Sequence, residues 1–476
     1  MNQHAPNACL PCSSHKRACD RLVPVCSRCA RHGTSCQYER STGYPQNFPA
    51  IRSTNQYGLQ TNTDLDQLLT SRLFDTLAII GIKASLEELT DAYLVSVHQW
   101  IPLIQSCNLK KQVSTLTSAP LAELSVFVLQ LILVVPPSSF PRPSDHDVLH
   151  WLYKQCRETF SLLQAHRRDS LLTIQSGLVL AIFEQSQGLY SDAYVTLSIC
   201  ASLGYVMGLD FITHPTDNVS QEKKYVWQAI FFVDVLNNLS FDRCSRPELV
   251  QTSDTSKKPE MFGDPGSTNS HPTIRSPSSE GVCTFDHIDR QIQAVHVLRR
   301  VLRLTRNKAV SLEMLLDYKS WGLDFLIQQG IHEVLSAPQH HLERQYAVVV
   351  IFLLSTFELH KKILACLKSQ HGPVEIRKIS VAALETALNL IQDLLRVEED
   401  TGCFDDKIMP ITFVMLMEEA GSTAILLESE YSLNTDGVFQ LALRALKCAS
   451  SRWIAADKIA LRLQNSRSQA MYSRAA

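Results

Sequence analysis

Six cysteines near the N-terminus constrain what this chain can fold into more than any other feature. They follow the spacing C-x2-C-x6-C-x6-C-x2-C-x6-C, which is two similar halves of three cysteines each. The six positions are Cys9, Cys12, Cys19, Cys26, Cys29 and Cys36. Tetrahedral Zn²⁺ takes four ligands, so two zinc ions share six sulfurs only if two of the sulfurs bridge both ions. The spacing therefore predicts a small cluster domain over residues 9–36 that holds two zinc ions.

The predicted zinc ions are structural, because sulfur fills every position and leaves no place for a reactive water. The alternatives are an accidental cluster of cysteines and a disulfide knot. The first residues, MNQHAPNA, are polar and do not form a signal peptide, so we expect the chain inside the cell. The other eight cysteines are then expected to be free thiols. They are Cys107, Cys156, Cys200, Cys244, Cys283, Cys366, Cys403 and Cys448.

The cysteine segment resembles the fungal binuclear zinc-cluster DNA-binding domain. Besides the cysteines, the resemblance rests on the run His15-Lys16-Arg17, on Asp20 and on Pro24. It implies that Cys9 and Cys26 are the bridging ligands. The other ligands would be Cys12 and Cys19 on one ion, and Cys29 and Cys36 on the other.

The resemblance also implies which side chains contact DNA. Lys16 occupies the position that reads guanine in a CGG triplet, with His15 and Arg17 beside it, and such a contact discriminates between bases by roughly 1–3 kcal/mol. The alternative is that Lys16 and Arg17 touch only phosphate or offset the cluster charge. Three further basic residues fit phosphate contacts better than base readout. They are Arg21, Arg28 and Arg31.

Charge is distributed unevenly along the chain. Residues 1–40 carry a formal charge of +4, so the remaining residues carry −6 of the total of −2. A basic head on a mildly acidic body is typical of a small nucleic-acid-binding module attached to a protein-binding or ligand-binding body. Ser13 and Ala18 stand where basic residues are usual, so we expect fewer phosphate contacts than a typical member makes.

The remainder of the chain has a helical pattern, so the predicted fold is mostly α. Residues 37–63 have the composition of a flexible linker. Residues 64–465 form an all-helical regulatory domain, interrupted at 253–281 by a Ser-, Pro- and Gly-rich insertion that we expect to be disordered. Apolar periodicity predicts helices at 170–183, 190–207, 222–239, 346–359, 374–397, 408–427 and 437–463.

The helical body also resembles the family's middle regulatory region. The resemblance rests on VHQWIPLI at 97–104, on a helix pair ending in GLD at 208–210, and on the helix 227–234 followed by Arg246-Pro247. Val235 follows Asp234 where the family commonly has a basic residue, so a local salt bridge is not expected there. No heptad pattern is sustained after the linker, so a homodimer is possible but gains no support from a coiled coil.

Other motifs give no indication of an enzyme. His146 and His150 are four residues apart, but Asp147 replaces the Glu of a zinc-protease motif, so a solvent-facing pair is expected. Arg299, Arg300 and Arg303 suit a nuclear import signal or, by default, a solvated helix face. The apolar run 121–135 is too short to span a bilayer and predicts a buried helix.

These observations together predict a transcription regulator in the nucleus. It would read CGG-containing promoter sites of RNA polymerase II genes and contact the transcription machinery. The family resemblance further implies control of a metabolic or secondary-metabolite pathway. The alternative function is a zinc-stapled protein-interaction adaptor that does not read bases.

Overall fold

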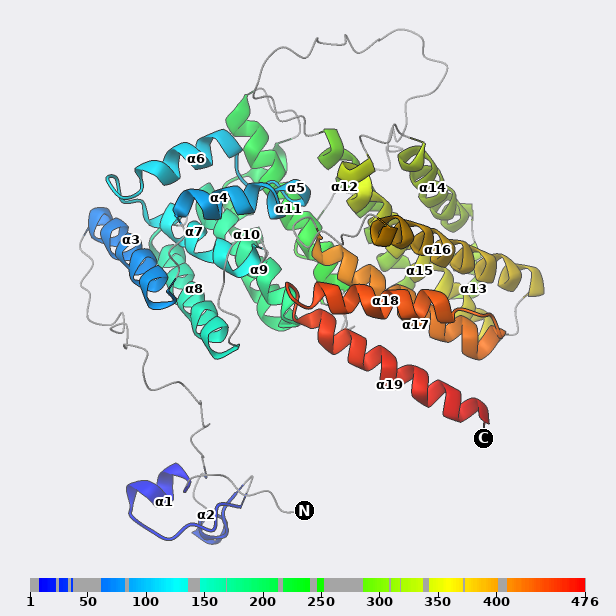
Figure 1. Cartoon of the computed structure of the whole chain (residues 1–476), viewed down its shortest axis with the longest axis horizontal. Helices are drawn as coiled ribbons and strands as arrows, with labels where there is room; N and C mark the ends of the chain where they lie inside the picture. The colour runs from blue at the N-terminus through cyan, green and yellow to red at the C-terminus, as the bar shows by residue number, and fades with distance from the viewer. Residues whose placement is uncertain are drawn as a thin grey trace. The chain divides into compact units, whose positions relative to one another are not determined.

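In a computed structural model of the protein, the described parts of the chain are built from helices (Figure 1). The structure describes residues 8–22, 25–32, 36, 61–81, 85–135, 146–167, 169–212, 217–239, 246–251, 286–307, 310–316, 318–336, 342–370, 373–400 and 409–475. No strand occurs in these ranges, which confirms the mostly α fold. Pro24, the insertion 253–281 and nearly all of the linker 37–63 lie outside them.

The chain divides into two units. One contains Met1–Gly58 and Asp145–Asp147, and the other contains Leu59–Ser144 and Val148–Ala476. We call the cysteine-rich segment the head and the second unit the body. The first helix of the body starts at Asn62 because Thr61 and Asp64 form a capping box, in which each side chain accepts the other residue's backbone N–H.

The first half of the body is built around α7. Every residue of α7 is buried, and the helix packs against α3, α4 and α9. A helix that is apolar on all sides is stable only inside a core, which is the burial expected for the run 121–135. The helices of this half are α3 (Asn62–Ile79), α4 (Leu86–Leu94), α5 (Val97–Trp100), α6 (Ser106–Thr115), α7 (Ala122–Val134), α8 (His146–His166), α9 (Leu171–Ser186), α10 (Tyr190–Val206), the 3₁₀ turn η2 (Leu209–Phe211) and α11 (Asn218–Leu239).

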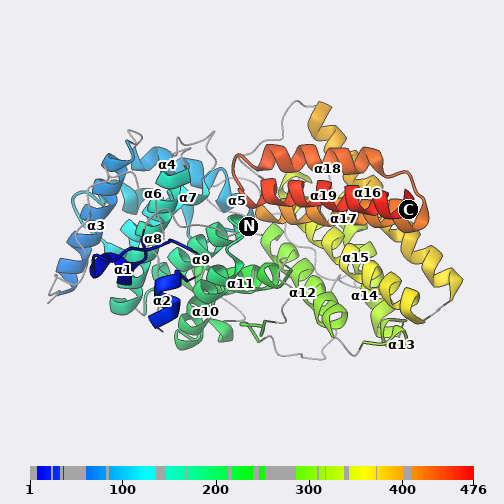
Figure 2. The same cartoon turned by 90° about the horizontal axis from the view of Figure 1, so that it is seen from below.

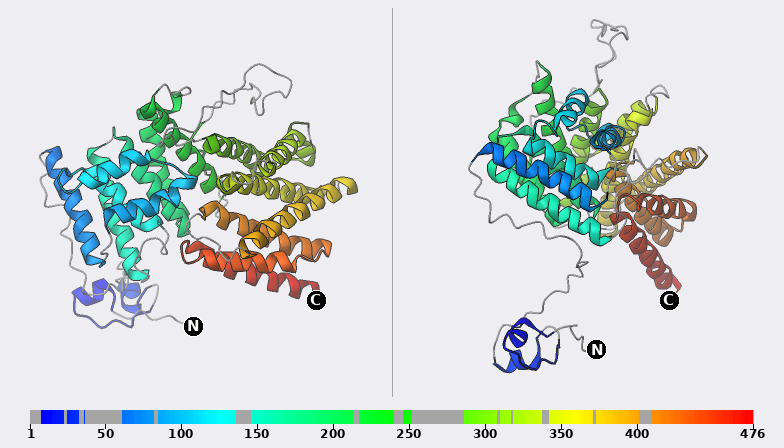
Figure 3. Two further views of the ribbon diagram at one scale, coloured as in Figure 1. Left: turned by 45° about the horizontal axis from the view of Figure 1, so that its top comes forward. Right: turned by 60° about the vertical axis from the view of Figure 1, so that its left-hand side comes forward.

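The second half of the body is built around α15, which contacts α12, α14, α16 and α17. Figures 2 and 3 show its long helices side by side, next to the first half. The helices of this half are α12 (Asp286–Arg306), α13 (Leu312–Leu316), α14 (Tyr318–Leu335), α15 (Leu342–Gln370), α16 (Val374–Asp400), α17 (Ile411–Tyr431), α18 (Asp436–Ala449) and α19 (Ala455–Ala475).

The helix expected at 437–463 is in fact two helices, α18 and α19. The chain turns between them because Arg452 and Trp453 are directed into the core, where they are 1% and 0% exposed. Both donate hydrogen bonds at 3.2 Å to the carbonyl oxygen of Met409. Arg452 also donates at 3.3 Å to the carbonyl of Val134, one of the last carbonyls of α7, which have no partner within their own helix. This arginine therefore joins the two halves of the body.

The segment 97–104 begins with the short helix α5, which a break at Ser96 separates from α4. The last helix, α19, continues to Ala475. The glycine of the GLD motif, Gly208, ends α10 at φ +67°, a conformation that glycine adopts without steric cost.

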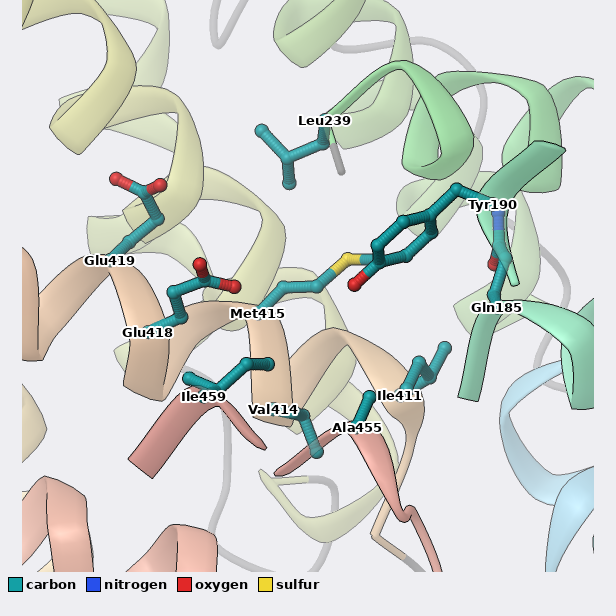
Figure 4. Close-up of a pocket in the computed structure, with 10 residues that line it drawn as sticks. All are labelled: Gln185, Tyr190, Leu239, Ile411, Val414, Met415, Glu418, Glu419, Ala455 and Ile459. Atoms are coloured by element: carbon teal, nitrogen blue, oxygen red, sulfur yellow. The ribbon is translucent and has the colours of Figure 1, made fainter. Parts of the chain in front are cut away.

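A small cavity lies where the two halves meet (Figure 4). Gln185, Tyr190 and Leu239 line it from the first half, and residues of α17 and α19 line it from the second half. Its volume is about 20 Å³, close to the roughly 10–15 Å³ that one water molecule needs. The cavity is therefore too small for an organic ligand. None of the described helices is long and apolar enough to cross a bilayer.

Candidate metal centre and nucleic-acid interface

Each CxxC pair of the head lies at the start of a short helix. The helices are α1 (Leu10–Ser14) and α2 (Ser27–His32). Cys9 has extended dihedral angles and caps α1, and Pro11 follows in the first turn, where its missing N–H breaks no helical hydrogen bond. Both helices thus begin inside the CxxC pairs, which brings the two sulfurs of each pair close together.

The distances between the cysteine sulfurs match a zinc–thiolate site. Cys9 Sγ lies 3.7 Å from Cys26 Sγ, 3.7 Å from Cys29 Sγ and 3.9 Å from Cys19 Sγ. A Zn–S bond of about 2.3 Å in tetrahedral geometry places neighbouring sulfurs about 3.8 Å apart. A disulfide would require about 2.05 Å, and all six cysteines are free. The geometry therefore excludes a disulfide knot and fits metal coordination.

The six sulfurs form two groups of four. One group contains Cys9, Cys12, Cys19 and Cys26, and the other contains Cys9, Cys26, Cys29 and Cys36, with sulfurs within 4.8 Å of one another in each. The groups share Cys9 and Cys26, the two bridging positions that the resemblance implied. Elsewhere in the described residues no other group of three or more possible ligands gathers, and His150 is exposed on α8.

The electrostatics of the head disfavour thiolates at most of the buried sulfurs unless a cation is bound. Burial raises the pKa of Cys9 and Cys12, and it raises the pKa of Cys29 to about 12. In contrast, the backbone N–H of Cys29, at 3.4 Å from the sulfur of Cys26, lowers the pKa of Cys26 to about 6. The buried thiols therefore cannot all ionise together unaided, and a bound Zn²⁺ would supply the positive charge that makes thiolates of them.

Asp20 has a structural role that sequence reasoning missed. Its two carboxylate oxygens accept the backbone N–H of Ser27, the first residue of α2, at 3.1 and 3.2 Å. Hydrogen bonds from Ser27 lower the pKa of Asp20. The carboxylate thus satisfies a free N–H at a helix N-terminus and ties the two halves of the head together. An acidic residue seven positions before the start of a helix gives no capping signal in the sequence.

Lys16 does not lie in the first helix but in the turn that ends it. Its φ is +50°, in the left-handed region that favours glycine. The N–H of Lys16 donates to Ser13 at 3.0 Å and that of Arg17 donates to Cys12 at 2.8 Å, which is a Schellman motif. A lysine held in this conformation is an uncommon and strained choice, of the kind that is found at functional sites.

The candidate DNA-contacting side chains all lie on the head. His15, Lys16 and Arg17 are exposed and consecutive at the end of α1. Arg21 is exposed in the connecting segment, with φ +59°. The other two are on α2: Arg28 is half-buried, and Arg31 is exposed with its Nε donating to the carbonyl of Ser27 at 3.4 Å.

Comparisons with known proteins agree with this geometry. Residues 7–45 match the model of the Fungal Zn(2)-Cys(6) binuclear cluster domain. A Botryotinia fuckeliana protein named Transcription factor BOA15 is 24% identical over 133 residues, which are 28% of this chain and 71% of the relative. Regulator of drug sensitivity 1 of Saccharomyces cerevisiae is 45% identical over 42 residues, which are 9% of this chain and 5% of that protein.

Proposed function

This chain belongs to the fungal Zn(2)-Cys(6) transcription factors, and on that premise we propose that its head reads CGG triplets through Lys16. As a member of the family it is a DNA-binding transcription regulator whose six-cysteine domain holds two structural zinc ions. In the proposed interface His15 and Arg17 flank the lysine in the major groove. Arg21, Arg28 and Arg31 would contact phosphates and set the register of the head on the duplex.

The backbone of Lys16 is the observation that carries this proposal. The Schellman turn leaves the side chain exposed at the C-terminal end of α1, beside two more exposed basic or polar side chains. A lysine that only offset cluster charge would need no strained backbone, because any exposed helical position would serve. A lysine can donate to O6 and N7 of guanine, the two acceptors that guanine presents in the major groove.

We propose three parts for the chain: the DNA-binding head at 9–36, a linker at 37–63 and a regulatory body at 64–465. In this proposal the protein acts in the nucleus, where the body passes a signal to the transcription machinery at promoters of a metabolic pathway. Mapping of bound promoters across the genome tests the pathway assignment, since bound promoters that are not enriched for the genes of a metabolic pathway would contradict it.

The experiment that tests base readout compares the full chain on a CGG duplex and on a scrambled duplex by fluorescence anisotropy. Lys16→Ala should lose roughly 1–3 kcal/mol of preference for CGG. Arg28→Ala should weaken binding to both duplexes alike and reduce the slope of log affinity against log salt by about one unit. Equal binding of the wild-type chain to both duplexes would support the adaptor instead, and an unchanged preference in Lys16→Ala would place the base reader elsewhere.

A further inference from the structure

A groove lies between the C-terminal helices α18 and α19, which pack against each other and against α17 (Figures 1 and 2). Leu443 and Lys447 line the groove from α18, and Lys458 and Leu461 line it from α19. Leu443 and Lys447 are four residues apart, so they lie on the same face of α18. The volume of the groove is about 410 Å³, so side chains of another molecule can enter it.

A stripe of exposed side chains continues from the groove along α19. Three large apolar residues belong to it: Leu461 is 60% exposed, Met471 is 48% exposed and Tyr472 is 78% exposed. Gln464 and Ser468 are exposed between them. At 3.6 residues per turn these five positions lie on one face of the helix, and the stripe is about 16 Å long.

The helix α18 cannot cover the far end of this stripe. Arg467 of α19 donates to Asp436, the first residue of α18, at 2.7 Å. The last two turns of α19 therefore extend beyond the start of α18. Met471 and Tyr472 lie on those two turns, where α18 does not shield them from solvent.

The groove is also basic. Lys447 and Lys458 are exposed, and among the residues that the structure describes neither ammonium group has an ion-pair partner. Asp457 is the acidic residue of the lining, so two lysines and one aspartate leave a charge of +1. Arg444 lines the groove as well, but it already has an interaction of its own, so we do not count its charge.

The basic residues of α12 differ from these lysines, because a carboxylate already pairs with them. Glu248 accepts from Nε of Arg303 at 2.8 Å and from Nε of Arg299 at 3.1 Å. The expectation of a solvated face at Arg299 is therefore wrong, because this side chain is only 3% exposed. The lysines beside Leu461, in contrast, remain accessible to a partner.

We infer that the groove and the stripe, which we together call the α18–α19 groove, bind an acidic amphipathic helix of a protein partner. Apolar side chains of such a helix would cover Leu461 and Met471, and its carboxylates would meet the two lysines. A stripe of about 16 Å corresponds to three turns of helix. The inference concerns the body alone and does not depend on base readout by the head.

Two other occupants fit the α18–α19 groove less well. A second copy of the chain in a two-fold symmetric contact would bring the same basic surface against itself, so that like charges would face each other. A nucleic acid would satisfy the lysines, but its phosphate backbone offers no apolar surface to cover Leu461 and Met471.

The test is fluorescence anisotropy of a labelled helical peptide that is titrated with the full chain. The peptide has about 18 residues, or five turns, with leucine on one face and glutamate on the other. We expect saturable binding of this acidic peptide, and none of a twin that carries lysine in place of glutamate. Lys447→Gln should weaken binding about two- to fivefold, the effect of one exposed ion pair. Leu461→Gln should weaken it about tenfold, because most of a leucine side chain is no longer buried by the peptide.

Lys111→Gln is the matched control, because Lys111 is an exposed lysine on α6 and does not line the groove. It should leave the affinity for the acidic peptide unchanged, and thermal unfolding of all three variants should match that of the wild type without peptide. The inference is overturned if the acidic peptide does not bind saturably at high micromolar concentration. Equal weakening by Lys447→Gln and Lys111→Gln would also overturn it, since that would indicate general attraction of acidic peptides to the body.

The same variants identify the other two occupants. Sedimentation that shows a dimer of the wild type and a monomer of Leu461→Gln would assign the α18–α19 groove to a second copy of the chain. Displacement of the peptide by a scrambled DNA duplex from the wild type would assign the groove to nucleic acid. Either result would overturn the inference.

Discussion

Replacing Lys16 by glycine separates what its backbone does from what its side chain does. At φ +50°, a lysine has a steric strain of roughly 1–2 kcal/mol that glycine does not have. Glycine also makes the unfolded chain more flexible, which costs about 0.4–1 kcal/mol of stability. The difference predicts that Lys16→Gly leaves the head as stable as the wild type or stabilises it by up to about 1.6 kcal/mol.

The DNA affinity of the same variant should change in the opposite direction. Without the ammonium group, the preference for CGG over a scrambled duplex should fall by roughly 1–3 kcal/mol, which is about 5- to 150-fold. Lys16→Ala should show the same loss of preference for CGG. Its head should be less stable than that of Lys16→Gly, because alanine has the same steric strain at this φ as lysine. Stability is measured as zinc affinity in competition with a chromophoric chelator, because folding and zinc binding are one event in such a small domain.

Two results would refute this reasoning. If Lys16→Gly releases zinc more readily than Lys16→Ala, the left-handed turn is not what the head requires at this position. If Lys16→Gly still prefers CGG as strongly as the wild type, the lysine does not contact guanine. Lys16→Arg serves as the control that keeps a guanine-binding charge, and it should retain most of the preference.

Further predictions concern the body. Glu248→Gln should destabilise the body by about 2 kcal/mol, which is less than the ~3–5 kcal/mol of a fully buried pair because the Glu248 side chain is 31% exposed. Urea unfolding at pH 7 measures this loss of stability, and an unchanged unfolding midpoint would contradict the prediction. The pKa of Glu248 is about 2, below its ordinary 4.5. The ionised carboxylate therefore stabilises the folded body above pH 4.5, and this stabilisation is lost as the pH falls towards 2. Glu248→Gln should make the free energy of unfolding less dependent on pH between 4.5 and 2. Gly330→Ala should destabilise by about 1–3 kcal/mol because the new methyl group collides with the Phe352 ring on α15. Gly322→Ala on the same helix has nothing within 4 Å and should stabilise by ~0.5–1 kcal/mol, so destabilisation by both variants would contradict the packing argument.

Local chemistry explains why so much of the head could be predicted from the sequence. Zinc ligands are specified by residue type and spacing, so the six cysteines alone predicted which sulfurs would gather. The turn at Lys16 was not predictable, because a lysine gives no sign of a left-handed backbone. The bond from Asp20 to Ser27 was missed for a similar reason, since it joins residues seven positions apart that no capping rule relates.

In the body, long apolar patterns predicted the buried helices but not their interruptions or contacts. The helices α9, α10 and α17 agree with the expected ranges to within a few residues. The break before α19 depends on Arg452 reaching Val134, more than 300 positions earlier in the chain, and no local pattern contains that information. Likewise, Arg299 and Arg303 were expected to face solvent because their partner Glu248 is distant in the sequence.

Zinc titration of the metal-free chain tests the central claim most directly. The chain is stripped of metal with a chelator, and its preference for a CGG duplex over a scrambled duplex is followed by fluorescence anisotropy as zinc is returned. The six-sulfur cluster predicts no preference without zinc and full recovery at two equivalents. A preference that survives without zinc, or that is restored in full by one equivalent, would contradict the account.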